Sequence, residues 1–176
     1  MKVFCFILFF WGTILYGETE YGSRILNHKN LENLTHNGFL QTYESDFTEF
    51  LHVNGSFQGS RSQIYELKVN GDTRLHECVI HGPLVVKGSL NADHSVFRGP
   101  LDLTCKSATF ERCAVTEDIV VNNVANYEGK QIIKLTRGAV VQGNITFDSK
   151  RGEVRLSKDS RVNGGVIGGH IQLFVE

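Results

Sequence analysis

Three histidines in the middle of the chain, His76, His81 and His94, are the side chains best suited to metal chemistry. Imidazole nitrogens are common zinc ligands, and the three residues could approach one another if successive segments of the chain stack. However, no two of the seven histidines are paired at a ligand spacing, and neither H-E-x-x-H nor C-x-x-C occurs. We therefore interpret these histidines as exposed turn residues and predict no metal site.

A second chemistry to consider is the cleavage of glycosidic bonds. It needs two carboxyl groups on one groove, one as the acid and the other as the base or nucleophile. Glu49 and Glu66 fall at the same corner of a repeat, and Glu117 falls at that corner several repeats later. There is no G-x-S-x-G motif and no glycine-rich phosphate loop. We predict a protein that is not an enzyme and needs no cofactor, with a small glycan-processing enzyme as an alternative.

A short repeat determines how these residues are positioned. Six stretches such as ELKVNG and PLVVKG share a leading apolar residue, which recurs at steps of 16, 17, 17, 18 and 26 residues. One step of 17 backwards reaches Leu34, and one step of 26 forwards reaches Ile171. The leading residues of the six stretches are Leu51, Leu67, Leu84, Leu101, Ile119 and Ile145. A repeat of this length, rich in β-branched residues and Gly, predicts a stacked β-solenoid over residues 34–176.

A second column of small residues supports the repeat. Each is followed two positions later by a large apolar residue, and the next leading residue comes five or six positions after the small one. Only the last step, from Ser160 to Ile171, breaks this count. The small residues are Ser45, Ser62, Cys78, Ser95, Cys113, Ala139 and Ser160. A third apolar pair in each repeat, such as Leu90 and Ala92, predicts three faces per coil. The predicted fold is all-β, a single-stranded β-helix of about eight coils of roughly 17 residues.

Two outward-facing columns are candidate binding surfaces. The first contains Tyr65, His81 and Arg98 on adjacent coils, a strip of stacking and hydrogen-bonding groups suited to a glycan or an acidic peptide. The second is an apolar stripe, which is either shielded or used to dock a partner. Its members are Val79, Val96, Ala114 and Val140. The alternative for both columns is an ordinary solenoid surface.

The N-terminus predicts export. Residues 1–17 combine Lys2, an apolar run and Gly17, which is typical of a secretory signal peptide. The run is short for a membrane span, so we expect none, although an uncleaved anchor is the alternative. We expect a secreted, periplasmic or envelope protein. The net charge of −1 gives no basic face for nucleic acid.

An exported chain permits disulfides, and three cysteines follow the predicted signal peptide. Cys78 and Cys113 lie two coils apart in the column of small residues, beyond the reach of a disulfide. Cys105 and Cys113 are the only local pair. We favour the interpretation that these thiols fill the core.

The ends and the insertions suggest where partners bind. Residues 18–33 contain Ile25, Leu26 and Leu31, which we interpret as a cap over the open core. At the other end, HIQLFVE has Ile171, Leu173 and Val175 in apolar phase. An uncovered strand edge pairs readily with another chain, so we expect either a monomer or a tail-to-tail homo-oligomer through the C-terminal edge. The extra residues around 124–130 and 148–153 fall between the same two faces, and insertions in repeat proteins often mark the functional side.

The segments GAVVQGNITF (138–147) and LSKDSRVNGGV (156–166) resemble the repeating phrases of bactofilins, polymer-forming bacterial cytoskeletal proteins. The resemblance implies a right-handed, three-faced β-helix that assembles end to end without nucleotide. Bactofilins are generally cytoplasmic, in contrast to the predicted export of this chain. We expect a non-catalytic binding or structural module, with a self-assembling bactofilin-like scaffold as the alternative.

Overall fold

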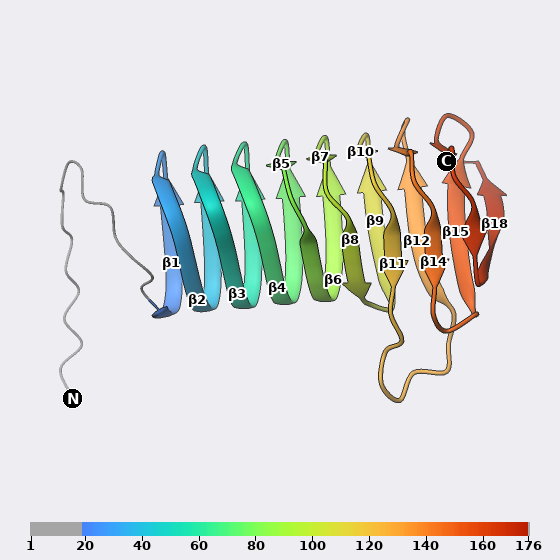
Figure 1. Ribbon diagram of the computed structural model, residues 1–176, viewed down its shortest axis with the longest axis horizontal. Helices are drawn as coiled ribbons and strands as arrows, with labels where there is room; N and C mark the ends of the chain where they lie inside the picture. The colour runs from blue at the N-terminus through green and yellow to red at the C-terminus, as the bar shows by residue number, and fades with distance from the viewer. Residues whose placement is uncertain (1–18, 176) are drawn as a thin grey trace.

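The computed structural model describes residues 19–175, which form a β-solenoid of about nine turns without a helix (Figure 1). The first strands run almost continuously around a coil and pair in parallel with the next coil. They are β1 (Thr19–Asn27), β2 (Asn30–Tyr43), β3 (Asp46–Ser60) and β4 (Gln63–His76). The all-β solenoid with coils of about 17 residues is confirmed.

Shorter strands in the later coils define three faces. Face A contains β5 (Val79–Ile80), β7 (Val96–Phe97), β10 (Ala114–Val115), β13 (Val140–Val141) and β16 (Arg161–Val162). Face B contains β8 (Leu101–Thr104), β11 (Ile119–Val121), β14 (Ile145–Phe147) and β17 (Val166–Ile167). Face C contains β9 (Ser107–Glu111), β12 (Gln131–Thr136), β15 (Gly152–Ser157) and β18 (Gly169–Phe174). The strand β6 (Leu84–Asp93) continues from face B into face C.

The interior is a continuous apolar core built from rows that run from coil to coil. The leading residues form one row on face B, where Leu67, Leu84 and Leu101 are in register and buried. Phe97 is buried on face A, in register with Ile80 on one side and Val115 on the other. Burying one such side chain contributes about 1.5–3 kcal/mol. Because each coil covers the core of its neighbours, stability is shared along the whole stack.

The predicted N-terminal cap is instead a coil of the solenoid. β1 pairs in parallel with β2 from Thr19 to Asn27, in the register of the later coils. Leu26 is buried, but Ile25 is 61% exposed and lies over no core surface. The coil was not recognised in the sequence because residues 18–33 lack both a leading Leu and an Asn-Gly pair such as those at 37–38 and 54–55. The stack therefore has about nine turns rather than eight.

Polar residues end the core at this first coil. In the register of β1 and β2, Glu20 is the partner of His36 and Arg24 is the partner of Leu40. Both therefore occupy inward positions of the first coil, where they form an ion pair with each other. His36 is 1% exposed, and its Nε2 lies 2.9 Å from the carbonyl oxygen of Gly22. Charges at inward positions of an outer strand discourage pairing with another chain. The first described coil therefore carries charged residues at two inward positions.

The last leading residue is Val166, not Ile171 as predicted. Ile145 pairs with Val166 on face B, whereas Ile171 pairs with Val154 on face C. The step between leading residues is therefore 21, and the distance from Ser160 to Val166 is the usual six. Extending the preceding step of 26 overshot because that step contains a long insertion that the final coil lacks.

The corner between faces B and C depends on glycines with positive φ. Gly38, Gly55 and Gly71 each follow an Asn and have φ of 133°, 147° and 154°. A Cβ on Gly71 would lie 2.1 Å from the carbonyl oxygen of Gly55, so the backbones of adjacent coils leave no room for a side chain. The corner is therefore closed by direct contact between the backbones.

The corner between faces C and A uses a left-handed residue followed by a small one. Arg61 and His94 have φ of 50° and 49°, and each precedes a buried Ser. The Ser95 hydroxyl donates to the carbonyl of Asp93 and accepts from the backbone N–H of Cys78 in the preceding coil. The small-residue column therefore satisfies backbone groups at a sharp corner, as buried polar groups require.

Both predicted insertions join face B to face C. Residues 122–130 connect β11 to β12 and form the loop below the solenoid in Figure 1, and residues 148–151 connect β14 to β15. Residues 1–17, the expected signal peptide, lie outside the described residues. Between residues 19 and 175 no helix is long and apolar enough to cross a membrane.

Candidate functional site

The two predicted surface columns lie side by side on face A. The polar column lies on three successive coils and consists of Tyr65, His81 and Arg98, each directly after a buried apolar residue. The backbone N–H groups of His81 and Arg98 each donate a hydrogen bond of 2.9 Å to the preceding coil. The apolar stripe lies two positions earlier in each coil, also pointing outward. Its members Val79, Val96, Ala114 and Val140 are in register from coil to coil. Face A therefore carries one apolar row beside one polar row, which we call the face A surface.

The polar row of the face A surface is held by its own hydrogen bonds. Arg98 Nη1 lies 3.3 Å from His81 Nδ1, and His81 Nε2 lies 3.2 Å from the Gln63 side-chain oxygen. A neutral imidazole with its proton on Nε2 accepts from Arg98 and donates to Gln63, so one tautomer satisfies both contacts. Tyr65 is 54% exposed, and it is one of few large apolar side chains on the outside of the described coils.

A second arrangement runs along the corner between faces C and A and was not predicted. The left-handed residues there stack from coil to coil, and most are charged. They are His28, Glu44, Arg61, Glu77, His94, Arg112 and Arg137. With their neighbours His76, Asp93 and Glu111 they form a chain of ion pairs, which we call the corner ridge. The signal was present in the sequence, because five of these residues directly precede a member of the small-residue column.

The corner ridge alternates in charge along its first half. Glu44 lies 2.8 Å from His28 and 3.4 Å from Arg61, and Arg61 lies 2.8 Å from Glu77. The hydrogen bond from Arg61 lowers the pKa of Glu77. Pairs this exposed add little stability one by one, but each partner fixes the direction in which the next side chain points.

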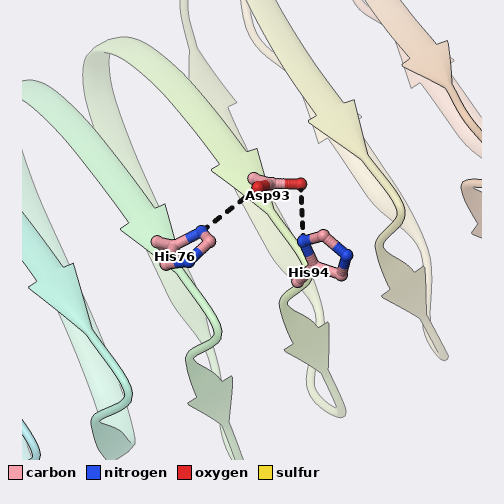
Figure 2. Close-up of side chains that lie close together, drawn as sticks. All are labelled: His76, Asp93 and His94. Atoms are coloured by element: carbon pink, nitrogen blue, oxygen red, sulfur yellow. Dashed lines mark hydrogen bonds and ion pairs between the residues drawn. The ribbon is translucent and has the colours of Figure 1, made fainter.

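In the middle of the corner ridge, two histidines face one carboxylate (Figure 2). His76 Nδ1 lies 3.1 Å from Asp93 Oδ2, and His94 Nδ1 lies 3.0 Å from Asp93 Oδ1. The two rings meet edge to face with centroids 6.0 Å apart. His81, which the sequence grouped with these two, instead belongs to the face A surface. The histidines predicted to be separate turn residues therefore form a pair around Asp93.

Arg112 completes the surroundings of this carboxylate. Its guanidinium donates to Asp93 Oδ1 at 2.8 Å and to His94 Nδ1 at 3.1 Å. Partial burial opposes ionisation of Asp93, but the hydrogen bond from Arg112 and the positive charge of its guanidinium lower the pKa of Asp93. Arg112 also lies 2.6 Å from Glu111, so it has a second carboxylate within reach.

The two insertions border a cationic hollow of about 560 Å³. Its lining carries Lys130, Lys150, Arg151 and His170 around the backbone of three glycines. The buried Glu153 lies beside it, 2.8 Å from Lys130 Nζ and 2.7 Å from Arg155 Nε. These hydrogen bonds, that of Lys130 first, lower the pKa of Glu153 to about 2. The side chain is therefore an anion at any physiological pH and neutralises part of the positive charge.

The thiols among the described residues do not form a reactive site. Cys78, Cys105 and Cys113 are free and buried. Burial raises the pKa of Cys105 to about 11 and that of Cys113 to about 12. The nucleophilic form of a cysteine is the thiolate, so both side chains stay chemically inert at neutral pH.

Two of the three carboxylates considered for glycan cleavage, Glu49 and Glu66, form contacts between coils. Glu49 accepts a hydrogen bond of 2.9 Å from the Asn33 amide, and Glu66 lies 3.2 Å from His52 Nε2. Both contacts run between adjacent coils at the corner between faces A and B. The two carboxylates therefore act as links between coils in this structure.

In comparisons with known proteins, the chain matches no family model, no curated protein and no solved structure. The assignment of the β-solenoid fold therefore rests on the structure alone. The resemblance to bactofilins is limited to short repeated segments.

Proposed function

We propose that this protein is a non-catalytic β-solenoid module, exported from the cell, whose face A surface binds an acidic glycan. The observation that carries the proposal is the placement of Tyr65, His81 and Arg98 on three adjacent coils beside an apolar row. The three positions cover about 10 Å, two strand spacings, which suits two or three sugar units. Export rests on the sequence of residues 1–17.

The chemistry of the face A surface fits such a ligand. An exposed Tyr ring stacks on the C–H face of a sugar while its hydroxyl stays in water. The guanidinium of Arg98 offers a planar pair of donors for a carboxylate or sulfate. The mutual hydrogen bond of His81 and Arg98 holds the cation in place before the ligand arrives, which reduces the entropy lost on binding.

Replacing Tyr65, His81 and Arg98 together with Ala should abolish binding to a printed array of uronic-acid and sulfated polysaccharides. We expect at least about a 30-fold loss of affinity, since a single hot-spot contact of about 2 kcal/mol is already worth that. The melting temperature should change little because exposed positions carry little packing energy.

The matched control replaces the same residue types on other faces, with Tyr21, His52 and Arg74 changed to Ala. These three side chains point outward from faces B and C. Their loss should leave array binding intact. Binding that survives in the folded face A triple variant, or that falls equally in the control, contradicts the assignment. Capture of acidic peptides but no polysaccharide would replace the glycan with a protein ligand.

A second candidate function, self-assembly, is favoured by the last coil. Leu173 and Ile171 continue the inward rows of face C yet are 72% and 48% exposed. The first coil carries the Glu20–Arg24 pair in such rows, so stacking it on the apolar rows of the last coil would bury that ion pair. We therefore propose that two last coils meet in a tail-to-tail dimer of this chain.

Leu173→Asp should convert this dimer to a monomer, because a carboxylate buried between two copies is costly. Light scattering coupled to size-exclusion chromatography measures the mass directly. Ile25→Asp is the control, since Ile25 is similarly exposed but lies outside the core rows of the first coil. A monomeric wild-type protein contradicts the dimer, and long polymers would favour the scaffold that the bactofilin resemblance implies.

A further inference from the structure

We propose that His76, Asp93 and His94 form a binding site for a divalent transition metal, with Zn²⁺ as the best-matched ion. The site is separate from the face A surface and does not depend on the proposed glycan ligand. It lies on the corner ridge, where two imidazole nitrogens face opposite oxygens of one carboxylate (Figure 2).

The donor set fits the ion. Two neutral imidazoles and a carboxylate are ligands that zinc accepts, with water in the fourth position of a tetrahedron. Ligand atoms 2.0–2.1 Å from a tetrahedral ion lie about 3.3–3.4 Å apart. The histidine nitrogens are already 3.1 and 3.0 Å from the Asp93 oxygens, and the three ligand atoms lie within 4.8 Å of one another. Small side-chain rotations would therefore bring all three into coordination.

The backbone holds the three ligands in place. His76 and Asp93 are direct partners in the register of β4 and β6. His94 follows in the left-handed conformation, and its N–H donates to the carbonyl of Glu111 in the next coil at 3.0 Å. Residues fixed by a ladder keep a coordination geometry more accurately than residues on a free loop.

An outer carboxylate supports the site independently of its ligands. Glu77 Oε1 lies 3.7 Å from His76 Nε2, the nitrogen that faces away from Asp93. Metal-binding histidines commonly donate their second N–H to a carboxylate, which fixes the tautomer that leaves the first nitrogen free for the metal. Glu77 is itself held by Arg61 at 2.8 Å. At 3.7 Å the contact between Glu77 and His76 is longer than a hydrogen bond, so we expect Glu77 to become the partner of His76 Nε2 after a small rotation when the metal binds.

Arg112 is the group that competes with the metal. It donates to both Asp93 and His94, so a metal ion has to displace it from this position. Glu111, only 2.6 Å away, can keep the guanidinium paired after it moves. Removing this cation should therefore strengthen metal binding, whereas it would weaken a purely structural ion-pair network.

The test is calorimetric titration of the untagged full chain with ZnCl₂ at neutral pH. We expect one Zn²⁺ per chain, and His76→Gln and His94→Asn should each weaken binding at least tenfold. Asn is chosen because it tolerates the left-handed conformation. Glu77→Gln should weaken binding about tenfold through His76, and Arg112→Gln should tighten it. His81→Ala, an exposed histidine on face A, is the control and should leave the affinity for Zn²⁺ unchanged.

Melting curves of each variant without zinc separate loss of the site from loss of the fold. A variant that keeps the wild-type melting temperature but loses the rise that zinc produces supports the site. The proposal is overturned if the wild-type protein shows no saturable binding, or if His76→Gln and His94→Asn bind zinc as well as the His81→Ala control does.

Discussion

Phe97→Ala should lower the free energy of unfolding by about 3–5 kcal/mol, the range for a large aromatic residue removed from a core. Phe97 is fully buried, and its ring meets Phe110 edge to face with centroids 5.7 Å apart. The neighbouring coils would lose contacts on both sides of the resulting cavity. Urea denaturation followed by circular dichroism measures the loss.

Tyr65→Ala is the matched control, because it removes an aromatic ring from the outer side of the same face. We expect it to cost less than about 0.5 kcal/mol. In a stack stabilised by neighbouring contacts, the Phe97 cavity should also broaden the transition as the two halves of the solenoid begin to unfold separately. A loss below about 1 kcal/mol would contradict the inward orientation of Phe97.

Gly71→Ala should destabilise the protein severely for a different reason. The new Cβ would lie 2.1 Å from the Gly55 carbonyl oxygen, at a φ of 154° that side chains rarely adopt. Strained dihedrals cost about 1–3 kcal/mol, and overpacking adds about 1–3 kcal/mol. Thermal unfolding should show a fall in melting temperature of roughly 4–24 °C, because a chain of this size loses roughly 2–4 °C per kcal/mol.

Gly22→Ala separates the two contributions to this loss. Gly22 has a φ of 103° but no heavy atom within 4 Å of the added Cβ. It therefore carries the dihedral strain without the collision and should cost clearly less than Gly71→Ala. Equal losses in the two variants would show that the collision of the added Cβ with the Gly55 carbonyl contributes nothing to the loss of stability in Gly71→Ala.

The sequence predicted the rows of the solenoid because each interior position of a parallel ladder requires an apolar side chain in every coil. Leu67, Leu84 and Leu101 all fill one interior row, so their spacing alone revealed the register. The prediction failed where a coil changes length or composition. Val166 was missed because the preceding insertion lengthened the step, and the first coil was missed because it carries Glu20 and Arg24 where the repeat has apolar residues.

The candidate sites were less accessible to sequence reasoning. Tyr65, His81 and Arg98 could be aligned in advance because they belong to the period of the repeat. The meeting of His76 with His94 could not, because it depends on the left-handed turn at residue 94 and on the direction of two side chains across coils. Periodicity predicts which residues stack, whereas turn conformation decides which of them face each other.

The alignment of the ladders gives this molecule an uneven response to force. The hydrogen bonds that join successive coils point along the long axis, while the covalent chain winds around it (Figure 1). Nine turns at 4.7–4.9 Å give a rod about 40 Å long. Tension along this rod loads the hydrogen bonds of one interface directly and peels the coils apart one after another. Compression only presses the stacked side chains together, so we expect the rod to resist compression far better than tension.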